Sequence, residues 1–353
     1  MIRNRNSATE GAIDLTTRYM GLRLRNPLIA SASPVTGELS TIRHIEDAGA
    51  AAVVLPSIFE EQIEQEVHEY EHLKGVALDG FPEVASFFPK PGFYKVDPHK
   101  YLDLIRRAVG AVEIPIIANL NGTTSDGWVN YARLIEEAGA QAIELNIYFI
   151  PTNLGMTGRD VEERHVEVVR AVCAAVAIPV AVKLHPYFSA VGSVIFELAG
   201  AGADAFVLFN RFYQPNIDLA RLRLRKDLQL SEPGEIRLPL LWIRMLAGRI
   251  DASLAASTGV ESAEEIVKYL LVGADVVMTT SSLLRHGIDH LRVLLNDLQT
   301  WCAAREFDAL SRFHGMLSQQ KLQSPTGIDR AHYIRILQGY SDAAARYCRR
   351  KLE

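Results

Sequence analysis

The chain contains little cysteine. Its three cysteines, Cys173, Cys302 and Cys348, lie far apart and form no C-x-x-C pair. Cysteine ligands of an iron–sulfur cluster or a structural zinc ion are usually closely spaced. This argues against either metal site within the chain, and it indicates a reducing compartment, for which we expect the cytoplasm.

Long hydrophobic runs are also missing. No apolar stretch reaches the ~20 residues that a membrane-spanning helix needs, and residues 1–12 lack the apolar centre of a signal peptide. We therefore expect no membrane partner, and we interpret residues 1–12 as a disordered tail. The net charge of −5 gives no electrostatic reason to expect a nucleic-acid partner, and the basic run at 221–226 is typical of a solvated loop.

Short apolar runs alternate with helical patterns along most of the chain. Four helical segments end in a similar phrase, and each phrase places a glycine just before the next apolar run, where a helix terminates favourably. These phrases are DAGA at 47–50, EAGA at 137–140, AGAGA at 199–203 and LVGA at 271–274. The candidate strands are Leu28–Ser31, Ala52–Leu55, Pro115–Leu120, Ala142–Ile147, Pro179–Leu184, Ala205–Asn210, Ala252–Ser257 and Asp275–Thr280.

Eight such units predict an α/β fold of the (β/α)8 TIM-barrel type, which needs ~250 residues. A doubly wound sheet uses similar units, and the number of strands favours the barrel. We expect an N-terminal hairpin over residues 13–25, insertions at 58–98 and 211–240 after the second and sixth strands, and a helical C-terminal extension. The predicted units are a tail at 1–12, a barrel at 13–302 and an extension at 303–353.

Polar side chains follow the predicted strands, at the edge where barrels carry their chemistry. Lys183 ends a buried apolar run, and an ammonium group there is costly to desolvate unless an anion or an electron-rich ligand pairs with it. The strand ends offer no paired carboxylates for glycosidase chemistry, and His185 is the one histidine near them, so no metal site is expected. The set suits a flat heterocycle with amide-like edges, such as a flavin or a pyrimidine: Ser31, Ser33, Ser57, Asn119, Asn121, Asn146, Lys183, Asn210, 257–259 and 279–281.

The last two strand ends suggest a phosphate site. Ser257 and Gly259 precede a helix expected near Glu261, and Thr279, Thr280 and Ser281 precede another expected near Leu283. Backbone N–H groups at helix starts favour anions, and barrels often hold phosphate after strands seven and eight. The alternative is that these residues only cap helices.

Other candidates also have structural alternatives. Asn146 and Asn210 could cap turns, and His185 could support its neighbours. Cys173 lies among alanines on a predicted helix, which indicates packing. Tyr148 could stack on a ring or fill a loop core.

Several segments resemble the dihydroorotate dehydrogenase family, especially its class 1 members, over roughly residues 14–300. AVKLHPYF at 181–188 is similar to the family's VKL-PYF, and ELNIYFIPTN at 144–153 to its ELN-[IL]-S-C-P-N motif. Further similar segments are RNPLIASASP at 25–34, IANLNG at 117–122, ASTGV at 256–260 and GADVVMTTSSLLRHG at 273–287.

The resemblance implies bound FMN, with Lys183 beside the N1–C2=O edge of an anionic reduced flavin. It also implies oxidation of dihydroorotate or a related CH–CH substrate by hydride transfer to N5, a role in pyrimidine biosynthesis, and a homodimer. The implied substrate-binding residues are Asn146, Asn153 and Asn210. The implied cofactor-binding residues are Ala32, Ser33, Ser57, Asn119, Asn146, Lys183, Asn210, Ser257, Gly259, Thr279, Thr280 and Ser281.

The chain departs from the family's pattern on the substrate side. The motif that holds the family's catalytic Cys or Ser reads YFIPTN here, so Tyr148 and Thr152 are the base candidates. The family's TKS is LPS at 55–57, and residues 58–100 contain no asparagine, although the family's substrate loop is rich in it. Because a general base contributes ~10²–10⁴ in rate, the true substrate stays open.

Three hypotheses follow for the whole chain. The first is an FMN oxidoreductase of dihydroorotate dehydrogenase type that acts on a pyrimidine-like substrate. The second is a flavin-binding barrel that relays electrons to a redox protein partner without catalysis of its own. The third is a lyase or isomerase barrel that binds a phosphosugar and no flavin.

Overall fold

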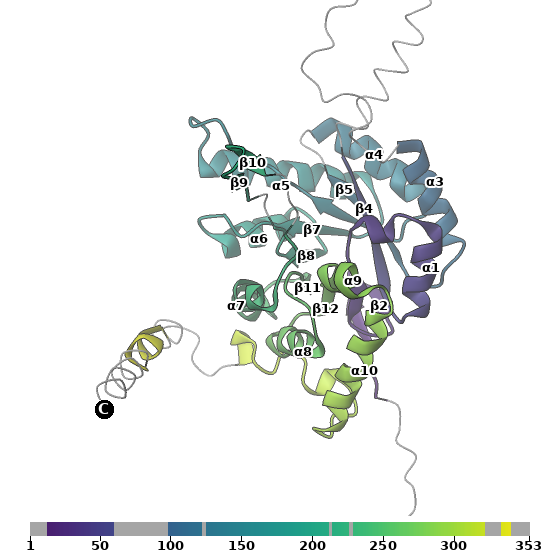
Figure 1. Cartoon of the computed structure of the whole chain (residues 1–353). Helices are drawn as coiled ribbons and strands as arrows, with labels where there is room; N and C mark the ends of the chain where they lie inside the picture. Colours follow the sequence, from purple (N-terminus) through teal and green to yellow (C-terminus); the bar gives the residue numbers. More distant parts are fainter. Residues whose placement is uncertain are drawn as a thin grey trace, which may run out of the picture.

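The computed structural model describes residues 13–59, 98–121, 125–211, 214–225, 229–321 and 333–339. Eight parallel strands close into a barrel, in the spatial order β11-β12-β3-β4-β5-β6-β7-β8. Helices surround this barrel on the outside (Figure 1). The predicted (β/α)8 fold is confirmed. The strands are β3 (Leu28–Ala30), β4 (Ala52–Phe59), β5 (Ile116–Asn121), β6 (Ala142–Asn146), β7 (Val180–Leu184), β8 (Ala205–Leu208), β11 (Ser253–Ala256) and β12 (Val276–Thr279).

Two apolar layers explain why these strands close. Strand side chains that point outward pack under the helices, in the main core cluster. Those that point inward include many alanines, such as Ala52, Ala142, Ala181 and Ala205. Small inward residues leave room within the barrel for longer polar side chains from the same strands. The helices are α1 (Leu39–Asp47), α3 (Pro98–Val109), α4 (Ser125–Glu137), α5 (Gly158–Ala175), α6 (Val191–Gly200), α7 (Arg237–Leu246), α8 (Ala263–Val272), α9 (Ser281–His286) and α10 (His290–Ala303).

A hairpin covers the floor of the barrel, as expected for residues 13–25. Strands β1 (Thr17–Tyr19) and β2 (Leu22–Leu24) pair antiparallel. Their two-residue turn has positive φ at both Met20 and Gly21, as this type of hairpin requires, and Gly21 adopts that conformation without strain. Tyr19 is fully buried among the inward-facing barrel residues, and Met20 N donates to Ser253 Oγ at the start of β11.

Strand β4 is longer than predicted. It continues through Pro56 to Phe59, with a register shift against β5 between Val54 and Ser57. A bulge of this kind accommodates the proline within a strand. The predicted insertion at 58–98 lies almost wholly outside the described residues.

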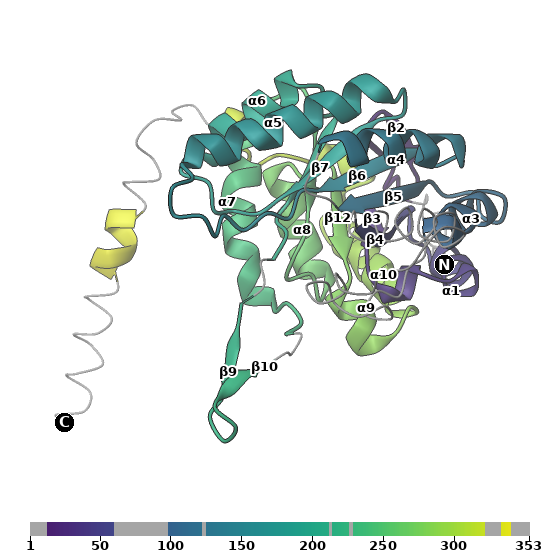
Figure 2. The same ribbon diagram turned by 90° about the horizontal axis from the view of Figure 1, so that it is seen from above.

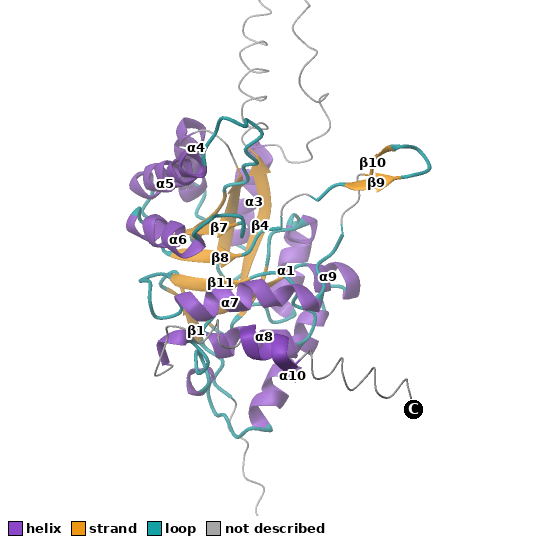
Figure 3. Cartoon of the chain, turned by 90° about the vertical axis from the view of Figure 1, so that its left-hand side faces the viewer, coloured by secondary structure: helices purple, strands orange, loops and turns teal. Residues whose placement is uncertain are grey.

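The second predicted insertion, 211–240, contains a hairpin of β9 (Asn216–Asp218) and β10 (Arg223–Arg225) and leads into α7. The hairpin projects away from the barrel (Figures 2 and 3). Beyond α10, residues 304–321 of the predicted helical extension form turns and short 3-10 helices. They pack on the outside of the barrel through the buried Leu310 and Phe313. Residues 333–339 are helical. Within the described part of the chain, no helix is both long and apolar enough to span a membrane.

Candidate functional site

A cavity of about 300 Å³ opens at the C-terminal ends of the barrel strands. Its walls come from Lys183 on β7, from the turns after β3, β8, β11 and β12, and from residues 229–231. Lys183 and Arg211 supply positive charge to its lining, which contains no carboxylate among the residues described. Nine residues predicted for the cofactor line it: Ala32, Ser33, Lys183, Asn210, Ser257, Gly259, Thr279, Thr280 and Ser281.

Lys183 belongs to a buried polar network. Only 8 % of the residue is exposed, and its Nζ donates to Glu144 Oε1 at 3.2 Å and to Ser31 Oγ at 3.5 Å. Asn119 Nδ2 donates to the same carboxylate oxygen at 2.6 Å. Ser57 Oγ in turn donates to Asn119 Oδ1 at 2.7 Å. Ser57 and Asn119 therefore reach Lys183 through Glu144, although neither lines the cavity.

Glu144 was missed by the sequence reasoning. It is fully buried in β6, two residues before Asn146 and on the same face of that strand. Its Oε2 atom has no hydrogen-bond partner among the residues that the structure describes. The sequence signal for Glu144 was an acid in the middle of the apolar run AIELN. An acid is rarely fully buried without a partner, so its presence in a predicted strand indicates a polar partner inside the barrel.

The asparagines predicted for the substrate divide into two groups. Asn210 Nδ2 donates to Asn146 Oδ1 at 2.7 Å, so the ends of β6 and β8 are joined above the barrel. Asn153 lies in an exposed turn, where its side chain accepts a hydrogen bond from Gly155 N at 2.9 Å. Of the base candidates, Thr152 is exposed and Tyr148 is half-buried, and neither lines the cavity.

Hydrogen bonds connect Ser231, Gly259 and Ser281 at the predicted phosphate end of the cavity. Gly259 has φ of +74°, and a Cβ on it would lie 2.7 Å from Ile236 Cγ2 and 2.8 Å from Glu232 O. Only glycine therefore fits there. Its N–H, predicted to face an anion, donates to Ser231 Oγ at 3.1 Å. Ser231 Oγ also donates to Ser281 Oγ at 2.9 Å.

Helices α8 and α9 begin beside these hydrogen bonds. Helix α8 starts at Ala263, with Ser262 as its cap, and α9 starts at Ser281. Each start lies two residues from the predicted one. Thr280 Oγ1 donates to Ser31 O at 3.2 Å, which ties the end of β12 to the end of β3.

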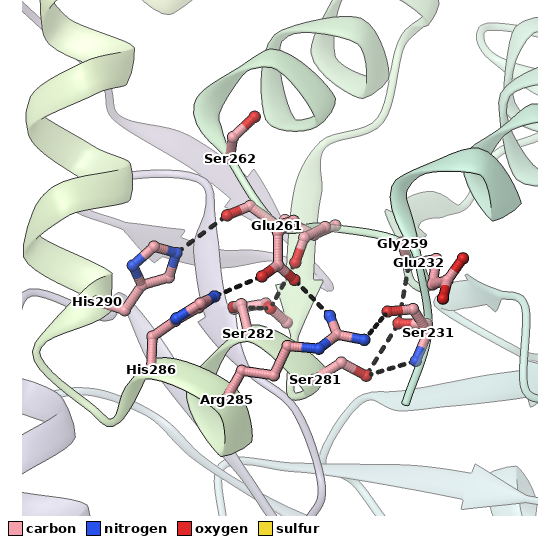
Figure 4. Close-up of polar contacts among 12 residues, drawn as sticks. Ser231, Glu232, Gly259, Glu261, Ser262, Ser281, Ser282, Arg285, His286 and His290 are labelled. Carbon is pink, nitrogen blue, oxygen red and sulfur yellow. Dashed lines mark hydrogen bonds and ion pairs between the residues drawn. The ribbon is translucent and has the colours of Figure 1, made fainter. Parts of the chain in front are cut away.

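Arg285 on α9 fastens residues 229–236, which we call the strap, to the turn before α8. Its Nη2 donates to Ser231 O at 2.8 Å and its Nη1 to Glu261 Oε2 at 2.5 Å (Figure 4). His286 Nε2 lies 2.5 Å from Glu261 Oε1. Burial alone would raise the pKa of Glu261, but the hydrogen bonds from His286 and Arg285 outweigh it and hold that pKa below its usual value. The strap is thus held in place by charge-assisted hydrogen bonds.

The strap has a second attachment. Arg211, just after β8, donates through Nη1 to Gln229 O at 2.5 Å, and its Nε lies 3.0 Å from Glu235 Oε2. Sequence reasoning missed the strap and both of its arginines, because the contacts join parts of the chain that are 18 to 54 residues apart.

His185 and Cys173 have the packing environments that the structural alternatives predict. The His185 ring stacks on Phe188 at a centroid distance of 4.3 Å, and burial lowers the pKa of His185 to about 4. Cys173 is half-buried against Gly202, and burial raises the pKa of its thiol to about 12. Neither residue lines the cavity. Within the described ranges, no group of three His, Cys, Asp or Glu side chains could hold a metal ion.

Comparison with known proteins places this site in a family context. Residues 14–301 match the family model described as dihydroorotate dehydrogenase. The chain is 28 % identical over 312 residues to a putative dihydroorotate dehydrogenase A (fumarate) of Aeropyrum pernix, which covers 86 % of this chain and 97 % of that protein. It is 24 % identical over 310 residues to the catalytic subunit of dihydroorotate dehydrogenase B (NAD(+)) of Thermoplasma acidophilum, covering 86 % and 98 %. It is also 24 % identical over 354 residues to the NAD-dependent dihydropyrimidine dehydrogenase subunit PreA of Escherichia coli, covering 91 % and 80 %.

Proposed function

Because the chain belongs to the dihydroorotate dehydrogenase family, we propose that it is an FMN-dependent oxidoreductase that acts on a CH–CH bond of a pyrimidine-like substrate. The observation that carries this proposal is the cavity itself. It combines Lys183 at one strand end with the hydroxyl-rich turns after β11 and β12, and its described lining contains no carboxylate that would repel a phosphate. Its volume of about 300 Å³ is at the lower end of the range for ligand pockets.

The residues present fit FMN at both ends of the cavity. Thr280, Ser281 and the turn around Gly259 would hold the phosphate, and Lys183 would face the N1–C2=O edge of the ring. FMN, when bound, supplies the acceptor for the hydride that leaves the substrate. Asn146 and Asn210 follow the strands on either side of Lys183, and this hydrogen-bonded pair would orient a planar substrate through its amide groups.

The substrate side favours a molecule other than dihydroorotate. The family's base motif reads YFIPTN here, and the half-buried Tyr148 and the exposed Thr152 are its hydroxyl groups. A neutral hydroxyl group is a weaker proton acceptor than a carboxylate or an imidazole. We therefore propose a related dihydropyrimidine or another CH–CH substrate whose proton is lost more readily.

Purified protein tests this function directly. We expect it to be yellow or to retain added FMN through desalting. Anaerobic addition of one member of a panel of dihydropyrimidines and dihydroorotate should then bleach the flavin band near 450 nm. Protein that retains no flavin would refute the proposal. Tyr148→Phe and Thr152→Val, compared with wild type in the same reduction assay, test the two base candidates.

A second candidate function is electron relay to a redox protein partner. It is supported by the altered base motif and by relatives whose names describe them as subunits. Bound flavin that no pyrimidine reduces, but that exchanges electrons with a redox protein, would favour relay over catalysis. The homodimer and the cytoplasmic location stay predictions, which sedimentation and cell fractionation would test.

A further inference from the structure

Glu144 is an acid that the fold keeps in a costly position. None of its surface is exposed, and within the described part of the chain its Oε2 atom has no hydrogen-bond partner. A buried carboxylate oxygen without a hydrogen bond costs free energy. Replacing a buried ion pair with apolar residues of similar volume is often neutral or stabilising. Stability alone therefore gives no reason for a glutamate at this position.

Several strands cooperate to hold this acid against Lys183. Asn119 on β5 donates to Glu144 Oε1 at 2.6 Å, and Ser57 on β4 holds the Asn119 side chain. Tyr101 on α3 holds the Asn119 backbone by donating to its carbonyl at 3.3 Å and accepting from its N–H at 2.8 Å. The Glu144 carboxylate is thus fixed on the side of Lys183 away from solvent, 3.2 Å from Nζ.

The position of Glu144 determines the net charge beneath the cavity. Lys183 lines the cavity, but Glu144 does not. In a poorly screened interior, a carboxylate about 3 Å from an ammonium cancels much of its field at longer range.

We propose that Glu144 is a positioning residue that moderates the charge of Lys183 and so sets the balance between the oxidised and the reduced cofactor. This inference rests on the proposed binding of FMN with its N1–C2=O edge near Lys183. Two electrons and one proton convert FMN into its anionic reduced form, which carries one more negative charge than the oxidised form. An unmoderated lysine would bind that extra charge more strongly and retain the electrons. Glu144 weakens this preference, so that the electrons pass on to the acceptor.

Two variants remove the negative charge with little change in volume. In Glu144→Gln, the amide oxygen can still accept from Asn119 and Lys183, and its NH2 group replaces the unpartnered Oε2. Glu144→Met removes the charge and the hydrogen bonds together, so it decides the question if the glutamine variant does not fold. Glu136→Gln is the matched control, because Glu136 on α4 also accepts two hydrogen bonds through one oxygen, from Ala177 N and Ile178 N.

The experiment measures the midpoint potential of bound FMN at pH 7 in the full chain, by dye equilibration during stepwise reduction with dithionite. We expect either variant at Glu144 to raise the ratio of reduced-state to oxidised-state affinity at least tenfold, which is about 30 mV for a two-electron couple. The control should stay within twofold of wild type. An unchanged or lowered ratio would overturn the inference, as would loss of FMN from both variants while wild type retains it. If wild type itself binds no FMN, the proposed function fails and this inference falls with it.

Discussion

Replacing Lys183 with methionine should destabilise the protein by more than the loss of one surface ion pair would. The residue is 8 % exposed, and its partner Glu144 is fully buried, with one oxygen that has no hydrogen-bond partner among the described residues. Without the lysine, Glu144 would keep the hydrogen bond from Asn119 and no other from the described residues. Breaking a buried pair by removing one partner costs about 3–5 kcal/mol. We expect a loss of this size in the free energy of unfolding.

A double-mutant cycle separates this charge effect from packing. Adding Glu144→Gln to Lys183→Met removes the stranded charge while the amide still accepts from Asn119. The double variant should therefore recover most of the loss, with a coupling energy of about 2–3 kcal/mol, within the range for residues in one network. Urea denaturation of the cofactor-free protein, followed by circular dichroism, supplies the four values.

The matched control is an exposed lysine. Lys268→Met breaks an i,i+4 pair with Glu264 on the surface of α8, where the side chains are 43 % and 70 % exposed. Such pairs contribute about 0.3–0.5 kcal/mol. The reasoning would be refuted if Lys183→Met cost no more than this control, or if the effects of the two substitutions in the cycle were simply additive.

Three further predictions concern the strap and the packed residues. Arg285→Met should weaken FMN binding about tenfold or more and leave riboflavin binding within twofold, because the arginine holds the strap at the phosphate end. Fluorescence titrations measure both affinities, and an equal loss of affinity for FMN and riboflavin would contradict this role of the strap. Gly259→Ala should reduce soluble yield and FMN retention, since its Cβ would lie 2.8 Å from a backbone oxygen at positive φ, and an unchanged melting temperature would contradict this. The pKa of Glu261 is held below its usual value, so its ion pairs should stabilise the fold fully at neutral pH and lose that effect as the pH falls through the lowered pKa. The difference in free energy of unfolding between wild type and Glu261→Gln should therefore shrink from pH 7 to pH 3, and a difference that grows in acid would contradict this.

The barrel could be predicted because each strand is a short apolar run and several are preceded by a helix that ends in glycine. The predicted strand ends agree with the observed ones to within a few residues, except where β4 continues past Pro56 through a bulge. A proline normally indicates the end of a strand, and pairing with β5 outweighs that local preference. The place of Lys183 was predictable for a related reason. A charged residue at the end of an apolar strand of a barrel lies at the C-terminal edge of that barrel.

The partners of Lys183 could not be predicted in the same way. Glu144, Asn119 and Ser57 come from three neighbouring strands, and their contacts depend on the register of β4, β5 and β6. A shift of one residue in that register would turn each side chain to the other face. The hydrogen bond from Gly259 N to Ser231 Oγ depends on how a long insertion folds back over the barrel, and local sequence patterns do not specify that path.

The central claim is that the cavity above Lys183 binds FMN, and one titration tests it most directly. Adding FMN to the full chain, while its fluorescence and absorbance are recorded, should give saturation at one FMN per chain with a shifted flavin spectrum. Riboflavin, which lacks the phosphate, should bind at least tenfold more weakly, and Lys183→Met should abolish the spectral shift. An FMN spectrum and fluorescence that stay unchanged at stoichiometric protein would contradict the account.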